Sequence, residues 1–304
     1  MSTPIILLLA LLLDAALGEP KWLWDRIPHP AVLMGRAVSA LDRALNTGRY
    51  ALLAGALTLA VLMGGAYLLG WGLNLLGGAA QVIIAAILLA QRSLVQHLQA
   101  VADGLRLSTG DGRAAVALIV SRDTAAMDPP AVARSAIESA AENLSDGVIA
   151  PAFWFLVGGL PALMVYKIVN TADSMIAYRT PKYEKFGKAT ALMDDALNLI
   201  PARLTSLLIA LPGGVIGTIM AIAIDAGRHR SPNAGWPEAA MARAIDVALA
   251  GPRAYDGKMQ DFAWVHEAGQ RTIGPDQIEA AIAKLWQAWA LMLAGTAALA
   301  VFGP

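Results

Sequence analysis

YALLAGALTLAVLMGGAYLLGWGLNLLGGAAQVIIAAILLAQ, residues 50–91, is a run of 42 residues without a charged side chain. A single helix of that length would measure about 63 Å, roughly twice the ~30 Å hydrocarbon core of a bilayer. Two membrane spans joined by a tight turn fit better, and Asn74 with Gly77-Gly78 supplies suitable turn residues. The run therefore predicts two transmembrane helices, at about 50–70 and 75–91.

Further apolar segments flank this pair and alternate with polar ones. The first, residues 4–17, ends near Asp14, and no Lys or Arg precedes it. A secretory signal peptide needs a positively charged start, so we favour a retained first span. We treat residues 1–304 as a single integral-membrane domain. The remaining apolar segments are 147–166, 204–224 and 285–304, and the polar segments are 18–49, 92–146, 167–203 and 225–284.

The composition supports a membrane protein and excludes several kinds of site. Hydrophobic residues make up 57% and charged residues 15% of the chain, whereas soluble domains carry about 25% charged residues. Lys plus Arg and Asp plus Glu number 23 each, which argues against a nucleic-acid partner. The chain has no Cys and only four His, without metal-ligand spacing. Disulfides, thiol nucleophiles and a His-based zinc site are therefore not expected.

Two apolar segments contain helix breakers. Residues 147–166 include Gly158-Gly159-Leu160-Pro161, and residues 204–224 include Pro212-Gly213-Gly214. Breakers release backbone groups that lipid cannot satisfy, so these segments should face protein or a wet cavity. Paired interrupted segments often mark a site in membrane proteins. Two kinked spans packed by small residues are the other interpretation, and the sequence leaves both open.

The four polar segments predict topology as well as helices. They carry five, five, six and seven Lys and Arg residues in chain order, so the positive-inside rule places all of them in the cytoplasm. Strict alternation would put 167–203 outside, a conflict that disappears if the interrupted segments are re-entrant. Leu94, Leu98 and Val101, like Met241, Ile245 and Leu249, recur at helical spacing. We expect an almost all-α, multi-pass inner-membrane protein with amphipathic helices on its cytoplasmic face.

Acidic residues gather just before the first interrupted segment. Asp128-Pro129 predicts a helix start, and Arg134, Glu138, Glu142 and Asp146 then follow at intervals of four. Such a row is most often a solvated helix face with an ion pair. Its end, however, places Asp146 at the predicted membrane boundary. Carboxylates there suit Mg²⁺, which binds one or two of them together with phosphate oxygens.

Two more polar clusters flank the interrupted segments. Adjacent aspartates before an apolar run are costly without a counter-charge or metal. The intervening basic stretch suits phosphate, or is simply a positive-inside loop. Gly187-Lys188-Ala189-Thr190 is not a phosphate-binding P-loop. The residues alone thus predict a membrane enzyme or transporter that handles an anionic, phosphorylated substrate with Mg²⁺. The clusters are Lys167, Asn170 and Asp173, then Asp194, Asp195, Asn198 and Arg203, with Arg179 between them.

Motifs spread over most of the chain resemble those of one family. They follow in order, at plausible spacing, from about residue 7 to residue 260. They are similar to the adenosylcobinamide-phosphate synthase family of cobalamin biosynthesis (CobD/CbiB). Glu19 is a departure, since the family more often has Asp there. The motifs are Asp14–Trp24, Pro28–Pro30, Leu33–Arg36, Ser121–Thr124, Ala136–Trp154, Tyr166–Met175, Asp194–Thr205 and Ser231–Ala242.

The resemblance implies an ATP-dependent ligase that joins adenosylcobyric acid to (R)-1-amino-2-propanol or its O-phosphate. Mg²⁺ would be the cofactor and ATP a co-substrate. On residue type and position, the candidate catalytic residues for this reaction are Glu142, Asp146, Lys167, Asp173, Asp194 and Asp195, of which Asp146, Asp173, Asp194 and Asp195 are the Mg²⁺ candidates. The candidate substrate contacts, chosen in the same way, are His29, Arg122, Asp123, Glu138, Asn143, Asn170, Arg179, Asn198, Arg203 and Asn233.

Other functions are compatible with the same residues. A membrane protein that binds or transports a corrinoid would use the polar clusters for recognition alone. A non-catalytic regulator similar to the β-lactamase-regulation sensor AmpE, from the same broad superfamily, is another possibility. The expected partners are a corrinoid, aminopropanol or its phosphate, membrane lipid and other enzymes of cobalamin biosynthesis, with no nucleic acid.

Overall fold

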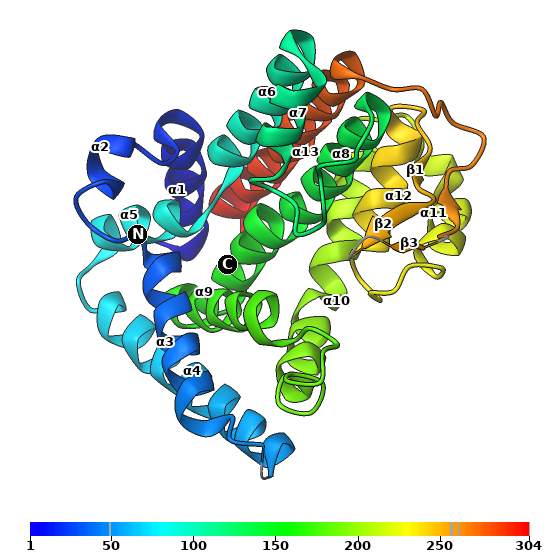
Figure 1. Cartoon of the computed structure of the whole chain (residues 1–304). Coiled ribbons are helices and arrows are strands. Elements are labelled where there is room, and N and C mark those ends of the chain that lie inside the picture. Colours follow the sequence, from blue (N-terminus) through cyan, green and yellow to red (C-terminus); the bar gives the residue numbers. More distant parts are fainter. Residues whose placement is uncertain (49, 256–257, 261, 304) are drawn as a thin grey trace. The chain divides into compact units, whose positions relative to one another are not determined.

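The structure is a computed structural model that describes residues 1–48, 50–255, 258–260 and 262–303. These residues are mostly helical (Figure 1). They form two compact units, each assembled from segments far apart in the sequence. Unit 1 comprises Met1–Ala90, Asp146–Leu199 and Gly295–Pro304, and unit 2 comprises Gln91–Ser145 and Ile200–Ala294.

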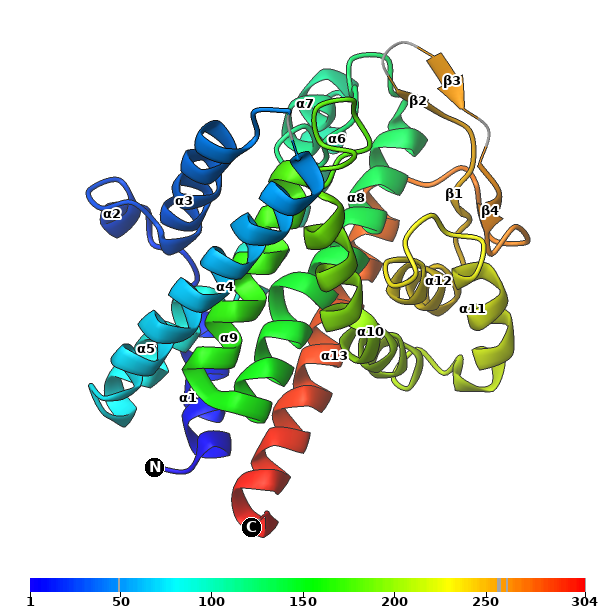
Figure 2. The ribbon, with the colours of Figure 1, turned by 90° about the horizontal axis from the view of Figure 1, so that it is seen from below.

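Unit 1 is built around two long apolar helices, α4 and α9, which run side by side (Figure 2). Buried apolar side chains from α1, α4 and α9, among them Leu7, Leu11 and Phe155, form its core. Two helices are shared with unit 2, since α10 and α13 cross the boundary. The elements are α1 (Thr3–Leu17), α2 (Lys21–Trp24), α3 (Pro30–Leu45), α4 (Ala51–Asn74), α5 (Gly78–Leu88), a π-helical turn (Ser145–Ile149), α9 (Ala150–Ile176), α10 (Lys188–Ala210) and α13 (Pro275–Phe302).

Glycines allow close backbone contacts between the helices of unit 1. A Cβ atom on Gly70 of α4 would lie 2.7 Å from the Cα atom of Pro161 in α9. A Cβ atom on Gly55 would collide with the carbonyl group of Phe186. Small residues are common at such interfaces because van der Waals packing is the main attraction between helices in lipid. The turn between α4 and α5 lies at Gly77, with φ at 87°, so the predicted turn is confirmed.

Both predicted interruptions of the apolar segments are present. Within α9, Gly158 and Gly159 leave helical geometry, and the φ of 63° at Gly159 is one that glycine adopts without strain. Helix α10 stops at Ala210, before Pro212 and Gly214. A 3₁₀ turn (Ile216–Thr218) and α11 (Ile219–Ala226) then follow. The second apolar segment is therefore not one continuous helix.

Unit 2 packs helices against a few short strands. Leu98 and Val101 of α6 and Ile137 of α8 are fully buried in its core. Asp128 caps α8 by accepting a hydrogen bond from the backbone N–H of Ala131 at 2.8 Å, which confirms the predicted helix start. β1 pairs with β4 and β2 with β3, both antiparallel. The elements are α6 (Gln91–Leu107), α7 (Thr109–Val116), α8 (Pro129–Leu144), α11, α12 (Gly235–Ala244), β1 (Leu249–Ala250), β2 (Arg253–Tyr255), β3 (Lys258–Gln260) and β4 (Trp264–Val265).

Two predicted helical patterns are wrong in detail. The spacing of Met241, Ile245 and Leu249 does not mark one helix, because α12 ends at Ala244 and Leu249 pairs with Val265 in a strand. Asp246 has a φ of 53°, a left-handed conformation that Asp tolerates better than most residues and that stops a helix. The acidic row along α8 is also broken, since Asp146 lies in the π-helical turn after the helix ends.

Four helical stretches of the described residues are long and apolar enough to cross a bilayer. Helix α1 is apolar but has only 15 residues, about 22 Å of rise. The chain is therefore a multi-pass helical membrane protein, as the sequence predicts. The four stretches are Ala51–Asn74, Gly78–Leu107 (α5 and α6), Pro129–Ile176 (α8 to α9) and Pro275–Phe302.

The glycine contact on α4 can be tested by adding one methyl group. We expect Gly55→Ala to destabilise the protein by about 1–3 kcal/mol, the usual cost of overpacking, because Cβ would displace the Phe186 backbone. Gly64→Ala is the matched control on the same helix, since nothing lies within 4 Å of its Cβ position. The measurement is thermal unfolding in detergent. Equal midpoints for the two variants would contradict the close approach.

Candidate functional site

In unit 1, Asn170 joins two of the predicted carboxylates. Its amide nitrogen donates to Asp146 Oδ2 and to Asp194 Oδ1, each at 3.3 Å. Asn198 donates to Asp194 Oδ2 at 3.0 Å and accepts from the Tyr166 hydroxyl at 3.0 Å. Tyr166 and Asn170 are one turn apart on α9, as are Asp194 and Asn198 on α10, so each helix offers two polar groups on one side. We call these five residues the Asn170 cluster.

Other predicted residues surround this cluster. The ammonium group of Lys167 interacts electrostatically with Asp146 and with Glu19. His29 is the N-cap of α3, and its Nδ1 atom accepts a hydrogen bond from the backbone N–H of Ala31 at 3.2 Å. Burial holds the pKa of His29 below its ordinary value, although the nearby Glu19 opposes this. Asp173 lies within electrostatic range of Tyr166.

The two adjacent aspartates of α10 are both harder to ionise than usual. Burial raises the pKa of the Asp194 carboxyl, against the hydrogen bonds from Asn170 and Asn198, and the charge of Asp195 adds to the rise. Burial also raises the pKa of Asp195, while Arg179 opposes it. A cation bound beside Asp194 and Asp195, in addition to Arg179, would therefore stabilise their ionised carboxylates.

The donor set fits Mg²⁺ in the way this ion is usually held by enzymes. Among the described residues, no group of three or more His, Cys, Asp or Glu side chains could hold a metal on its own. Asp146 and Asp194 offer a pair of carboxylates that share one amide donor. Mg²⁺ commonly binds one or two carboxylates together with substrate phosphates. Asp146 and Asp194 are therefore the residues that would hold it.

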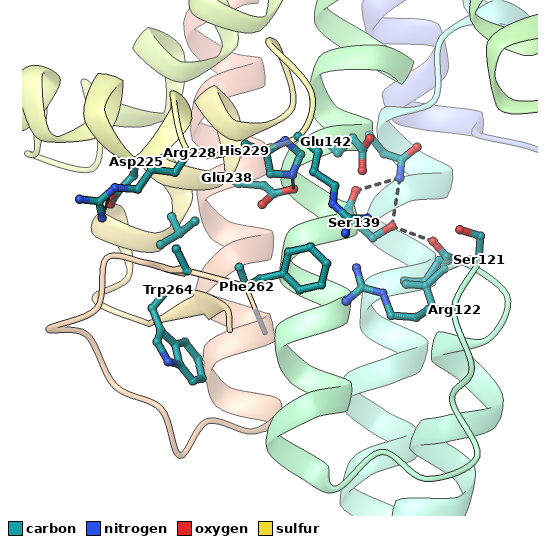
Figure 3. Close-up of a pocket in the computed structure, with 17 residues that line it drawn as sticks. Ser121, Arg122, Ser139, Glu142, Asp225, Arg228, His229, Glu238, Phe262 and Trp264 are labelled. Atoms are coloured by element: carbon teal, nitrogen blue, oxygen red, sulfur yellow. Dashed lines mark hydrogen bonds and ion pairs between the residues drawn. The ribbon is translucent and has the colours of Figure 1, made fainter. Parts of the chain in front are cut away.

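In unit 2, other predicted residues line a cavity of about 310 Å³. Its walls come from the 119–122 segment, helix α8, the 225–230 turn, the start of α12 and the 262–265 segment (Figure 3). We call it the Glu142 cavity. Its polar lining residues are Ser121, Arg122, Ser139, Glu142, Asn143, Asp225, Arg228, His229, Arg230 and Glu238, and its aromatic ones are Phe262 and Trp264.

Both signs of charge occur in the Glu142 cavity. Arg122 forms an ion pair with Glu138, with 2.9 Å between Nη2 and Oε2. His229 faces the buried Glu238, with 3.6 Å between Nε2 and Oε1 (Figure 3). The guanidinium group of Arg230 lies 4.4 Å from the ring centre of Phe262. Such a lining suits a ligand that carries a negative group beside an apolar or cationic part.

The remaining predicted contacts in unit 2 engage neighbouring protein groups. Arg203 donates to Asn233 at 3.3 Å and stacks over Trp236. Asp123 accepts the backbone N–H of Ala125 at 2.9 Å, and Asn143 donates to the Ser139 carbonyl group at 2.8 Å. Of these, only Asn143 lines the Glu142 cavity.

Sequence reasoning missed several lining residues, namely Asp225, Arg228, His229, Arg230, Glu238, Phe262 and Trp264. Glu238 lies within the Ser231–Ala242 motif, and residues 228–230 directly precede it. Their position within or beside this motif is the feature of the sequence that could have indicated them. A single histidine without metal-ligand spacing, and single aromatic residues near short strands, carry no periodic pattern that would mark them.

A family model described as CobD/Cbib protein matches residues 7–285. The chain belongs to the CobD/CbiB family. The predicted family resemblance is thereby confirmed over nearly the whole chain.

Individual relatives match just as broadly. The cobalamin biosynthesis protein CobD of Sinorhizobium fredii is 46% identical, over 97% of this chain and 96% of the relative. The protein of that name from Rhizobium meliloti is 47% identical, over 98% and 97%. That from Rhodobacter capsulatus is 43% identical, over 88% of each chain. No solved structure matches the chain.

The raised pKa of Asp194 has a measurable consequence for stability. A carboxyl whose folded pKa is raised stabilises the fold at low pH, and this contribution is lost as the pH rises through the folded pKa. We therefore expect the wild-type protein to gain stability relative to Asp194→Asn as the pH falls from 7 to about 4, the ordinary aspartate value. The unfolding midpoint in detergent measures this. Glu184→Gln, at an exposed carboxylate, is the control, and a difference for Asp194→Asn that stays constant with pH would contradict the expectation.

Proposed function

We propose that the protein is an ATP-dependent ligase that forms the amide between adenosylcobyric acid and (R)-1-amino-2-propanol or its O-phosphate. Its relatives are cobalamin biosynthesis proteins, and family membership gives this chain the same broad role. The observation that best supports an enzyme is the convergence of three family motifs on one cavity. Arg122, Glu142 and Glu238 come from separate motifs, and all line the Glu142 cavity.

The proposed reaction begins with activation of a poor electrophile. A carboxylate oxygen of the corrinoid attacks the γ-phosphorus of ATP, and the bond to ADP breaks with its electron pair leaving on ADP. The amine nitrogen then attacks the acyl carbon, and inorganic phosphate departs. The nitrogen loses its proton to a base. Cationic groups must stabilise the transferring phosphoryl group, and a carboxylate or imidazole must accept the proton.

The Glu142 cavity contains groups of both kinds. Arg122, Arg228 and Arg230 supply positive charge from two segments of the chain. Glu142 is an exposed carboxylate on α8 that lines the cavity, so it is our candidate for the proton acceptor. These assignments support phosphoryl transfer and amine attack.

The Asn170 cluster is our candidate for the magnesium site. Mg²⁺, when bound there, would neutralise the negative charge of a phosphate group. Asn170 orients Asp146 and Asp194 by donating to both. Lys167 interacts with Asp146 and thereby limits the negative charge near the pair. Asp173 and Asp195 add further carboxylates in the same unit.

We also propose where in the cell the protein lies. An inner-membrane location with the polar segments in the cytoplasm follows the distribution of Lys and Arg. ATP and the corrinoid would then reach the polar segments from the cytoplasm. Lipid surrounds the spans, and other enzymes of cobalamin biosynthesis are the expected partners.

The function is tested by turnover of the purified protein. In detergent, with ATP, Mg²⁺, adenosylcobyric acid and aminopropanol phosphate or aminopropanol, we expect ADP release together with a new amide. Mass spectrometry of the corrinoid and a coupled assay for ADP measure both. A corrinoid transporter would instead give ATP-independent uptake into vesicles without amide formation, and a regulatory relative would give neither activity.

The Asn170 cluster is tested by removing single charges. We expect Asp194→Asn and Asp173→Asn each to lower turnover at least about 100-fold, the scale of a lost catalytic group, while the protein stays folded and membrane-inserted. Glu184→Gln serves as the control, because its carboxylate is exposed and lies outside the proposed site. Near-normal rates for both aspartate variants would rule out the proposed magnesium site without affecting the family assignment.

A further inference from the structure

Glu138 is a buried carboxylate with two partners that belong to different walls of the Glu142 cavity. Only 3% of its surface is exposed. One oxygen, Oε2, lies 2.9 Å from Nη2 of Arg122. The other, Oε1, accepts the backbone N–H of Ala250 at 2.8 Å. Arg122 and Ala250 both line the cavity, whereas Glu138 does not.

Arg122 is held by two residues of α8, Glu138 and Ser135. Its side chain is 15% exposed, and it also donates to Ser135 Oγ at 3.4 Å. Arg122 and Ala250 line both the Glu142 cavity and a neighbouring cavity of about 280 Å³, which Glu138 also lines. A guanidinium group carries five N–H donors in one plane, so it can bind a carboxylate on one side and an anionic ligand on another.

The second partner of Glu138 fixes the aromatic wall. Ala250 and Gly251 have positive φ angles of 59° and 71°, and a Cβ atom on Gly251 would lie 2.6 Å from the Trp264 ring. The guanidinium group of Arg271 lies 4.6 Å from the centre of that ring. The Ala250–Gly251 turn therefore sets where Trp264 lies, and Glu138 holds the turn to α8.

Two carboxylates of the cavity are already matched with positive or N–H groups. Asp225 accepts from Arg243 at 2.7 Å and from the backbone N–H of His266 at 2.9 Å. Glu238 faces His229. The third carboxylate that lines the cavity is Glu142, the proposed proton acceptor, and the cavity has three arginines, Arg122, Arg228 and Arg230. Arg228 is only loosely paired, 3.6 Å from Asp225 and 59% exposed.

We propose that the Glu142 cavity is a phosphate-binding subsite in which Arg122 contacts the phosphate and Glu138 is the residue that positions Arg122. This proposal rests on the ligase function above, and the ligand class is a phosphate ester. Planar guanidinium groups bind phosphate through paired hydrogen bonds. The cavity lies at the small end of the roughly 300–1,000 Å³ range of ligand pockets, which is enough for a phosphate ester. The phosphate belongs either to ATP or to aminopropanol phosphate.

Binding measurements separate these two sources without requiring turnover. The probes are a non-hydrolysable ATP analogue, aminopropanol phosphate and unphosphorylated aminopropanol, titrated into the full-length protein in detergent by calorimetry. We expect Arg122→Gln to weaken binding of one phosphate probe about tenfold or more, the loss expected for a hydrogen bond between charged groups. The probe that loses affinity identifies the source of the phosphate.

Glu138→Gln tests the positioning role, because glutamine can still accept from Ala250 but no longer pairs with Arg122. We expect it to raise the KM for the same phosphate substrate about tenfold and to change the other KM values little. In an Arg122→Gln background the same change should add almost nothing, since coupled residues are not additive. Ser108→Ala, which removes the cap of α7, is the control for lost stability and should leave these KM values unchanged.

The outcomes distinguish this inference from the ligase proposal. Additive effects of the two variants, or an unchanged affinity for both phosphate probes in each, would overturn the inference even if the protein forms the amide. Binding of unphosphorylated aminopropanol as tight as that of the phosphate, together with an unchanged affinity of Arg122→Gln for the ATP analogue, would overturn it too. Weaker phosphate binding in Arg122→Gln and in Glu138→Gln, with calorimetric effects that are not additive in the double variant, in a protein that forms no amide, would instead refute the ligase and retain the subsite.

Discussion

A polar group buried away from water must find a hydrogen-bond partner inside the protein, because leaving it unsatisfied costs free energy. This constraint accounts for the arrangement of both candidate sites. Asn170 uses one amide nitrogen for Asp146 and Asp194, and Glu138 uses its two oxygens for Arg122 and Ala250. In each case one side chain links segments far apart in the sequence. Polar residues that form separate clusters along the sequence are thus joined by hydrogen bonds in the folded protein.

The sequence predicts best what depends on neighbouring residues. The apolar runs, the cap at Asp128 and the interruptions at Gly158-Gly159 and Pro212 follow from local chemistry, and all are present. The end of α12 before Ile245 was not predictable from helical spacing, because it depends on the left-handed Asp246 and on pairing of Leu249 with Val265. Periodicity reports which faces are apolar, not which tertiary partner ends an element.

The same distinction applies to the candidate site. The sequence indicated charged and amide side chains as site candidates, but it could not say which of them contact one another. Arg203 and Asn233 bind each other, and neither lines the Glu142 cavity. His229 and Glu238, which do line it, were missed because a lone His–Glu pair has no sequence spacing that marks it. Within the described residues, acidic and amide groups gather in unit 1, and arginines gather around the cavity of unit 2.

The buried pair of Arg122 and Glu138 is the clearest sign that geometry, not stability, shaped the cavity. Removing two charges from water costs about as much as their attraction returns, so apolar residues of similar size would often stabilise such a position equally well or better. Glu138 is 3% exposed, so its desolvation is nearly complete. What the pair supplies, and apolar side chains could not, is a fixed direction for a cation at a cavity wall. A site that must recognise a charged group before reaction has a use for that direction, since a donor held in place needs no reorganisation when charge develops.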